Sequence, residues 1–433
     1  MAQLLPFRGY RYAPEHVADM TDVVAPPYDR VYPDVQEACY ERSDFNIVRI
    51  IKGKEQAGDD EQKNVYSRAA DHLRRWIEEG ILQRDSTPAL YAYHQTYSFG
   101  GERLTRKGII ALGKLEPEKV HAHERTLKGP REDRLKLIRA TEANFGHIFM
   151  LYSDPNRTAD AVAAEAIEGT TPDIEATDAD GNLHQVWAIT DSETIARIQG
   201  ALSEKDLYIA DGHHRYETAV NYMRECEEKG WKPAAAESFD ARMMTLFNVN
   251  EPGTSIRPIH RMVHGLRSFD LEQFLSKASE RFEVERVGDM QAMTEAVAEA
   301  GKHAFGLATQ DAFAVLKLRE GVDLHELVSA DRSNDYVNLD VAVLHAGILE
   351  ELLGIDAKAL EEQTFVTYTV DVAKAEKALA SGAEQAFFFM NATRADEVVR
   401  VADHGEKMPQ KSTDFYPKLL TGLVLTVMEI DKS

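Results

Sequence analysis

The sequence predicts a mixed α/β protein with a central site and a helical outer layer. Apolar runs of strand type alternate with amphipathic, helix-like stretches along most of the chain, which is the pattern of sheets covered by helices. The stretch Asp206–Ala219 shows this order within a few residues, as a short apolar strand, an Asp-Gly break and a helix. With 433 residues, 43% hydrophobic and 28% charged, the chain can bury the cores of about two or three domains.

In the N-terminal part we expect a strand, a stiff loop and two helices. The segment Leu4–Tyr12 is predicted as a short strand. Val23–Asp29 is predicted as a rigid loop, because its two prolines fix the backbone and exclude helix. A helix is expected around residues 35–40, and a longer amphipathic helix from Asn64 to Glu79, whose apolar residues share one face.

In the next part a hairpin is the strongest expectation. Leu90–Phe99 and Arg103–Leu112 flank a Gly-Gly pair, which is a hairpin signature. Aromatic residues alternate along the first strand, and this favours a packed sheet face over a platform for stacking bases. Pro130 suits the first turn of a following helix, and His147–Leu151 is predicted as a buried strand.

The C-terminal half again alternates strands and helices. Ala241–Val249 is predicted as an apolar strand, and Ile256–Val263 as an extended segment after it. A helix is expected over residues 339–354. Phe387–Asn391 is an uninterrupted apolar run, so it is predicted as a buried strand of the parallel type.

The central Asp206–Ala219 stretch predicts an anion site. Basic residues oppose the dipole at a helix N-terminus, yet His213, His214 and Arg215 all occupy this first turn. The unpaired backbone N–H groups of such a turn bind anions, and Gly212 allows a close backbone approach. The pattern therefore favours a bound phosphate or carboxylate. The alternative is a surface turn with two solvated histidines.

Two other polar stretches carry candidate ligands. His121 and His123 have the spacing of metal ligands on a strand, but no third ligand follows at a diagnostic spacing, so a metal role ranks below anion binding or structure. Met408–Leu419 combines two lysines, a Ser-Thr pair and two prolines, which predicts an ordered anion cradle. The alternative for this segment is a solvated C-terminal loop.

Charge and composition exclude several classes of partner. The net charge of −23 disfavours nucleic acid, because phosphate contacts dominate that affinity, although a local basic cluster can still bind a small anionic metabolite. Cys39 and Cys226 are the only cysteines, so we expect no disulfide framework and no cysteine-based zinc site. No apolar run reaches the roughly 20 residues of a membrane span, and no signal-peptide pattern is present. We expect a cytoplasmic protein without a membrane partner, and leave a homodimer open.

Several polar motifs follow one another along nearly the whole chain. They are Arg8–Arg11, Ala25–Asp29, His123–Glu124, Asp133–Arg134, Ala210–Arg215, His260–Arg261 and Met408–Lys418. In this order they resemble the bacterial and archaeal DUF1015 family. The Asp-Gly-His-His-Arg turn further resembles the ParB/sulfiredoxin superfamily with its free serine kinase branch, in which the equivalent turn binds nucleotide phosphate or phosphoserine. The resemblance implies a ParB/sulfiredoxin-like core with additional strands and helices.

The chain differs from the ParB/sulfiredoxin superfamily in two features, and each difference excludes one function of that superfamily. Sulfiredoxins carry a reactive cysteine directly before the His-Arg pair, where this chain has His213, so repair of cysteine sulfinic acid is not expected. Partition-type ParB proteins add a helix-turn-helix and a basic surface, and the sequence shows neither. Members of the family are often encoded beside serine-biosynthesis enzymes, which implies O-phosphoserine as a substrate.

The leading hypothesis is phosphoryl transfer on a small phosphorylated metabolite. An O-phosphoserine phosphatase comes first, and a nucleotide-dependent free serine kinase that uses ADP or ATP is the alternative. The kinase needs a nucleotide site, and the sequence has no Walker-type glycine-rich loop. Mg²⁺ is an allowed cofactor of either enzyme. A second alternative is a sensor that binds a phosphometabolite or a nucleotide without turnover.

Two groups of site residues follow from this hypothesis. Phosphoryl transfer needs cations on the transferred group together with an acid, a base or a nucleophile. The predicted catalytic residues are Asp211, His213, His214 and Arg215. The predicted substrate-binding residues are Arg8, Tyr28, Asp29, Glu124, Gly212, His260, Arg261, Lys411, Ser412, Thr413 and Lys418. Asp29 and Glu124 are assigned to a substrate ammonium group. The predicted regions are 1–150, 151–265 with the central turn, and 266–433.

Overall fold

The chain forms two compact units. The computed structural model describes residues 3–122 and 128–433. Unit 1 comprises Met1–Ser255 and Pro417–Ser433, and unit 2 comprises Ile256–Tyr416. This division differs from the three predicted regions, since the boundary after residue 150 falls inside strand β8 (Ile148–Tyr152). The local pattern along a sequence predicts elements, but it does not show that the C-terminal segment returns to the first unit.

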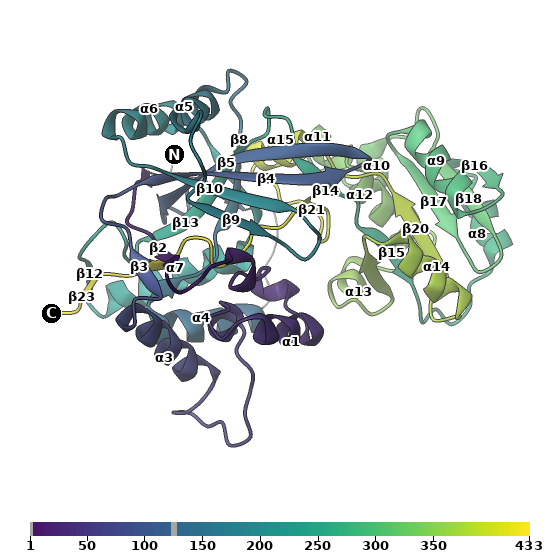
Figure 1. The fold of residues 1–433 in the computed structure, drawn as a ribbon. Coiled ribbons are helices and arrows are strands. Elements are labelled where there is room, and N and C mark those ends of the chain that lie inside the picture. The colour runs from purple at the N-terminus through teal and green to yellow at the C-terminus, as the bar shows by residue number, and fades with distance from the viewer. Residues whose placement is uncertain (1–2, 123–127) are drawn as a thin grey trace. The chain divides into compact units, whose positions relative to one another are not determined.

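Unit 1 contains the larger set of elements (Figure 1). Its helices are α1 (Pro33–Arg42), α2 (Val48–Ile51), α3 (Val65–Glu78), α4 (Lys128–Thr141), α5 (Thr158–Ile167), α6 (Ser192–Leu202) and α7 (His213–Glu228). Its strands are β1 (Leu4–Leu5), β2 (Tyr10–Tyr12), β3 (Leu82–Arg84), β4 (Leu90–Phe99), β5 (Glu102–Lys114), β6 (Val120–Ala122), β7 (Ala143–Asn144), β8, β9 (Ile174–Thr177), β10 (Leu183–Ile189), β11 (Leu207–Asp211), β12 (Lys232–Pro233), β13 (Ala241–Asn248), β22 (Thr426–Val427) and β23 (Ile430–Asp431).

A mixed sheet runs through unit 1 and confirms the predicted α/β class. Its strand order is β6-β11-β8-β13-β5-β4-β10-β9, with β1 beside β5. Strand β11 runs parallel to β6 and antiparallel to β8, and β13 runs parallel to β8. The predicted hairpin is confirmed as β4 and β5, and its aromatic residues Tyr91, Tyr93 and Tyr97 are buried as expected of a packed face.

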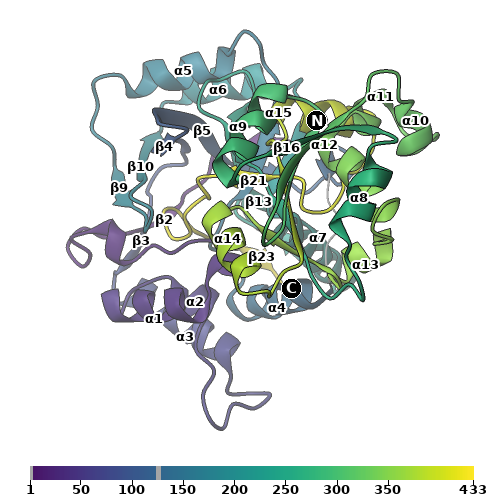
Figure 2. The same ribbon diagram turned by 90° about the vertical axis from the view of Figure 1, so that its right-hand side faces the viewer.

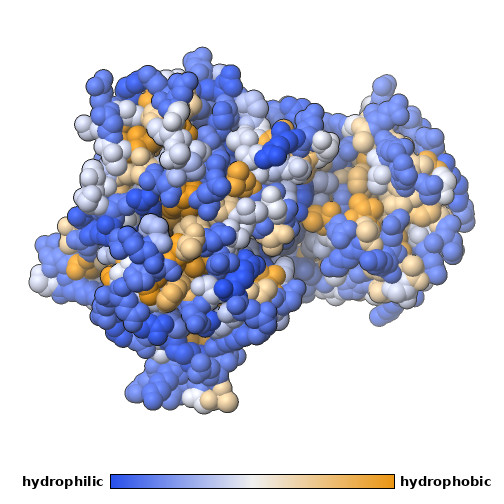
Figure 3. Space-filling model, in the orientation of Figure 1, coloured by the Kyte–Doolittle hydropathy of each residue, from blue (hydrophilic) through white to orange (hydrophobic). Residues whose placement is uncertain are grey.

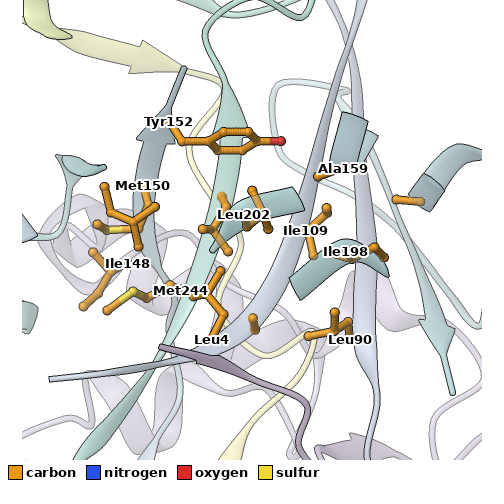
Figure 4. Close-up of a cluster of buried hydrophobic side chains, with 14 of the residues drawn as sticks. Leu4, Leu90, Ile109, Ile148, Met150, Tyr152, Ala159, Ile198, Leu202 and Met244 are labelled. Atoms are coloured by element: carbon orange, nitrogen blue, oxygen red, sulfur yellow. The ribbon is translucent and has the colours of Figure 1, made fainter. Parts of the chain in front are cut away.

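One face of this sheet packs on helices through aliphatic side chains. Because side chains alternate along a strand, Ile148, Met150 and Tyr152 of β8 point to the same side. They join a buried cluster with Ile198 and Leu202 of α6, which Figure 4 shows against the strands. The aromatic residues of β4 occupy the alternate positions and face the other side. The C-terminal segment that follows residue 416 crosses that second side.

Helices α1, α2, α3 and α4 form a second cluster in unit 1, and Figure 2 shows the first three gathered together. The predicted helix Asn64–Glu79 is confirmed as α3. Asn64 is its N-cap residue, since its side chain accepts hydrogen bonds from two backbone N–H groups of the first turn. Helix α4 packs along α7, with Arg131 Nη1 lying 3.1 Å from Glu217 Oε2. This packing places the first half of α4 beside the start of α7.

Unit 2 is built on an antiparallel sheet. Its strands are β15 (His260–Val263), β16 (Phe282–Val287), β17 (Ala304–Ala308), β18 (Phe313–Leu318), β19 (Val366–Thr369), β20 (Ala386–Met390) and β21 (Asp414–Tyr416), and β14 (Ser255–Arg257) begins at its boundary. Its helices are α8 (Leu271–Ala278), α9 (Met290–Ala300), α10 (Leu324–Leu327), α11 (Asn334–Val337), α12 (Asp340–Val343) with a π-helical continuation Leu344–Glu350, α13 (Ala357–Glu361), α14 (Val372–Ala380) and α15 (Ala395–Asp403).

The prediction of a parallel strand at Phe387–Asn391 is wrong. Strand β20 pairs antiparallel with both β15 and β17, in a sheet ordered β16-β18-β17-β20-β15-β19. Four of its five residues are buried, since β20 is an inner strand with helices α9 and α14 packed on it. A continuous apolar run therefore reports burial on both faces, and parallel pairing is only one way to reach it.

Hydrophilic residues cover most of the face drawn in Figure 3. Within the described ranges, no helix is both long enough and apolar enough to cross a bilayer.

Candidate functional site

The central turn has the predicted order of strand, turn and helix. Strand β11 ends at Asp211, after an irregularity in its pairing with β8 between Ile209 and Asp211. Gly212 then takes a left-handed conformation, with φ of 97°, and α7 begins at His213. A Cβ atom on Gly212 would lie 3.0 Å from Arg215 Nη2, so both the dihedral angle and the close approach require glycine. The bulge and the turn together direct Asp211 away from the regular strand.

Asp211 lies between two cations. Its Oδ2 is 3.4 Å from Lys418 Nζ and 3.9 Å from Arg215 Nη2, and its Oδ1 accepts the N–H of Gly212 at 2.8 Å. Burial alone would raise the pKa of Asp211. The positive charges of Lys418, Arg215 and His213 outweigh burial and hold the pKa of this carboxyl far below its usual range. Asp211 is therefore a carboxylate at neutral pH.

Arg215 connects the turn to the neighbouring strand. Its side chain is buried, and Nη1 donates to the carbonyl oxygen of His147 at 2.5 Å. A Cβ on Gly146 would lie 3.2 Å from the same nitrogen, so this nitrogen packs against the backbone of residues 146–147. Arg215 consequently supplies a fixed positive charge and also part of the local structure.

Lys418 reaches the turn from the far end of the sequence. Gln95 Nε2 donates to the carbonyl oxygen of Lys418 at 3.0 Å, and the buried Arg106 donates to the carbonyl oxygen of Pro417. These bonds fix the C-terminal segment across β4 and β5. The structure thus brings together Asp211 and Lys418, which the sequence analysis assigned to one site.

The two histidines begin α7. His213 is buried and His214 is half-buried. His213 contributes to the electrostatic field on the Asp211 carboxyl. Their assignment as acid or nucleophile stays a prediction.

Tyr28 also lies near this turn. The guanidinium of Arg134 lies over its ring, 4.1 Å from the ring centroid. Burial is the main cause that raises the pKa of Tyr28 to about 12, so this group stays a neutral phenol at pH 7. Arg215 is one of the charges that acts on Tyr28, whereas the neighbouring Asp29 is exposed.

Two predicted substrate-binding residues are placed elsewhere or not described. Arg8 belongs to a different charge cluster, where its Nη2 lies 3.3 Å from Glu429 Oε1 and its backbone N–H donates to Glu237. Glu124 lies outside the described residues.

The remaining predicted residues belong to unit 2. Arg261 is fully buried, and its Nη2 donates to the carbonyl oxygen of Lys411 at 3.0 Å. His260 stacks on Phe389 with 4.4 Å between ring centroids, and burial lowers its pKa to about 3.

The loop beside these two residues is anchored within unit 2, as predicted. Ser412 is buried and donates to the carbonyl oxygen of Pro409 at 2.5 Å. Lys411 has a left-handed backbone with φ of 57°, and Thr413 is half-buried. The bonds of Arg261, Ser412 and the backbone of Lys411 stabilise the loop itself, and a ligand role for these residues stays a prediction.

The described residues do not fit a metal site at the turn. Asp211 is engaged by Lys418 and by the N–H of Gly212. Within the described ranges there is no group of three or more His, Cys, Asp or Glu side chains that could hold a metal ion.

The sequence analysis missed Arg242 and did not assign Arg134 to the site. Arg242 lies on β13 and is buried, and both arginines line a cavity with Arg215. The available signal was a single charged residue in a strand that is apolar apart from Thr245 and Asn248, because a buried charge requires a partner or a ligand.

Three solved structures illustrate what the chain is similar to. A mutant of a free serine kinase in complex with AMP matches at a TM-score of 0.35 and 14% identity, covering 71% of this chain and 86% of that chain. A conserved hypothetical protein from Pyrococcus furiosus matches at 0.33 and 15%, covering 72% and 94%. A C-terminally truncated SbnI from Staphylococcus aureus matches at 0.34 and 9%, covering 71% and 84%.

The comparison with curated proteins gives no match. The family model described as "Protein of unknown function (DUF1015)" matches residues 4–342. Since this match spans well over half of the chain, the protein belongs to the DUF1015 family.

Proposed function

We propose that the protein catalyses phosphoryl transfer on a small phosphorylated metabolite at the junction of β11 and α7. The observation that carries the proposal is the position of Asp211 between Lys418 and Arg215 at the first turn of a helix. Two cations and one carboxylate leave a net positive charge there, and the N-terminus of α7 adds backbone donors. Transfer of a phosphoryl group depends mainly on such positioning and charge stabilisation.

We propose different roles for the charged residues. Arg215 is fixed by the backbone of His147, so it supplies a rigid charge. Lys418 has a flexible side chain that can turn from Asp211 to a phosphate oxygen. The low pKa of Asp211 makes it a weak base, which favours orienting Lys418, water or a substrate hydroxyl over removing a proton early. His213 and His214 are then the proposed proton donors and acceptors.

O-phosphoserine is the substrate we propose first, with hydrolysis to serine and phosphate. We also propose that this chain is related to the ParB/sulfiredoxin superfamily. That relation implies that nucleotide phosphate or phosphoserine binds at this turn. The alternative direction is a free serine kinase that uses ADP or ATP. Under either direction the phosphoryl group would lie beside Arg215 and Lys418.

The test is phosphate release from O-phosphoserine, measured with and without Mg²⁺, and transfer between serine and ADP or ATP. Lys418→Met should lower the rate about 100-fold or more, because one cation on the transferred group is lost. Lys432→Met is the matched control, since Lys432 lies in the same C-terminal segment and pairs with Glu142 at 2.8 Å.

The outcomes separate the candidate functions. Release that needs no nucleotide identifies a phosphatase, and transfer that requires a nucleotide identifies a kinase. Saturable binding of these compounds without any product would contradict the proposal and favour a sensor. An equal rate in Lys418→Met and the control would remove the β11–α7 turn from the reaction.

A further inference from the structure

Three arginines from different elements converge on one small cavity of unit 1. Arg134 of α4, Arg215 of α7 and Arg242 of β13 line it, together with Thr218 of α7. Apolar side chains such as Leu137 complete the wall. Guanidinium groups that share a poorly hydrated space repel one another, unless carboxylates or a bound anion compensate their charge.

The carboxylates of the described residues do not compensate all three charges. Arg134 binds Asp133 through two nitrogens, at 2.9 and 2.6 Å, and Arg215 lies 3.9 Å from Asp211. Arg242 is 7% exposed, and its Nη2 donates only to a backbone carbonyl at 3.3 Å. In the described part of the chain no carboxylate pairs with Arg242. The cavity therefore keeps an uncompensated positive charge.

Two buried side-chain atoms of residues that line the cavity also have no hydrogen-bond partner among the described residues. They are Nε of Arg242 and Oγ1 of Thr218, whose residue is 3% exposed. Thr218 follows Arg215 by three positions on α7, so the two side chains share a face of the helix. Buried polar groups almost always have a hydrogen-bond partner, and two orphans on one cavity indicate a ligand that accepts hydrogen bonds.

The pKa of Arg242 is consistent with an uncompensated positive charge in the cavity. Burial, followed by the charges of Arg215 and Arg134, lowers the pKa of Arg242 to about 9. The folded protein thus pays for keeping Arg242 cationic at neutral pH. A bound anion would remove this penalty, and its binding would stabilise the fold.

We propose that this arginine cavity binds phosphate, either as the inorganic ion or as the phosphoryl group of a small monoester. The cavity volume is about 50 Å³, which exceeds the roughly 10–15 Å³ that one water needs and is too small for a whole nucleotide. Guanidinium groups bind phosphate oxygens in pairs, and three of them suit a dianion better than a carboxylate with two oxygens. The cavity shares Arg215 with the β11–α7 turn, and a phosphoryl monoester as its ligand rests on the proposed function.

The test is binding of inorganic phosphate by the full chain, followed by calorimetry and by thermal unfolding at constant ionic strength with chloride as reference. Phosphate about tenfold above its Kd should raise the Tm by about 2–4 °C. Arg242→Met should abolish this rise, and Thr218→Val should weaken binding about tenfold by removing one hydroxyl donor. Arg139→Met on α4 is the control, because Arg139 is outside the cavity and pairs with Glu225 at the surface.

If Arg242→Met fails to fold, Thr218→Val serves as the test variant, since valine has nearly the shape of threonine. A second titration with O-phosphoserine identifies the source of the phosphoryl group by the lower Kd. Absence of phosphate binding in the wild type, or equal binding in Thr218→Val and the control, would overturn the inference.

The phosphate-binding experiment tests the cavity separately from catalytic turnover. Phosphate binding that is lost in Arg242→Met, in a protein without phosphoryl transfer, would support the cavity and refute the proposed function. Transfer without any phosphate-induced stabilisation would do the reverse.

Discussion

At the scale of single residues, the charge state of the site depends on contacts between distant parts of the sequence. The strand–turn–helix order around Asp211, Gly212 and Arg215 was predictable from a local pattern, and an anion at this turn stays a prediction. Lys418 was assigned to the same site under the phosphoryl-transfer hypothesis, and the structure places its Nζ 3.4 Å from Asp211 Oδ2. Arg242 gave only a general signal, one arginine in a largely apolar strand, because the residues around its side chain come together only when three elements pack.

The role of a single residue in unit 2, Arg261, can also be tested. Arg261→Met should lower the free energy of unfolding by about 3 kcal/mol, because backbone carbonyls that Arg261 serves would be left buried without donors. Amide exchange in residues 408–413 should become faster, since the bond to Lys411 is lost. Denaturant unfolding measures the first effect, with the exposed Lys407→Met as control.

The opposite result would support the predicted anion cradle at Met408–Leu419. Unchanged stability of Arg261→Met, combined with weaker binding of phosphate or O-phosphoserine, would show that Arg261 serves a ligand and not the loop.

At the scale of elements, most predictions depended on local signals. The hairpin β4–β5, helix α3 with its Asn64 cap, and the β11–α7 junction were all predictable, because turn residues and hydrophobic period agree there. The pairing direction of β20 was not, because an apolar run reports burial and not the neighbours of a strand. Helix bounds inside Leu339–Gly354 also depend on tertiary contacts, which produce a π-helical segment.

The turn before α7 gives a prediction with an internal control. Gly212 and Gly230 flank the same helix, with φ of 97° and 76°. An added Cβ meets nothing within 4 Å at Gly230, whereas at Gly212 it meets the guanidinium of Arg215. Gly230→Ala should cost about 1–2 kcal/mol of stability through its left-handed backbone alone. Gly212→Ala should cost more and also lower phosphoryl transfer at least tenfold.

Unfolding curves and rates for both variants check this prediction. Equal losses of stability together with unchanged transfer in Gly212→Ala would mean that the contact between Gly212 and Arg215 has no part in the site.

At the scale of the whole molecule, the sequence indicated enough chain for several domains but not how the chain is divided. Residues 417–433 belong to unit 1, because carbonyl oxygens of this segment accept hydrogen bonds from β4 and β5. Those bonds join positions more than 300 apart, which no local pattern can reveal. The same return of the chain brings Lys418 to the central turn.

Buried histidine makes the stability of unit 1 depend on pH. Burial is the largest cause that lowers the pKa of His147 to about 4, from an ordinary value near 6.5. As pH falls through this window the unfolded chain binds a proton that the folded chain refuses, so stability is lost between about pH 6.5 and 4. The loss from His147 should approach about 3 kcal/mol.

Denaturant unfolding at pH 7 and pH 4.5 measures the effect. His147→Gln keeps a polar group near Thr245 and Val424, and its stability should fall less steeply than that of the exposed His16→Gln control. Equal slopes for the two variants would assign the acid sensitivity to other groups.

The most direct measurement is phosphorus NMR of O-phosphoserine incubated with the wild type and with Asp211→Asn, without nucleotide and with AMP or ADP as the phosphoryl acceptor. Asn keeps the shape of Asp211 but removes the carboxylate that holds Lys418. We predict product in the wild type and a loss of about 100-fold or more in the variant, with the fold retained. No product under any condition, or equal product from both proteins, would contradict a phosphoryl-transfer site at this turn.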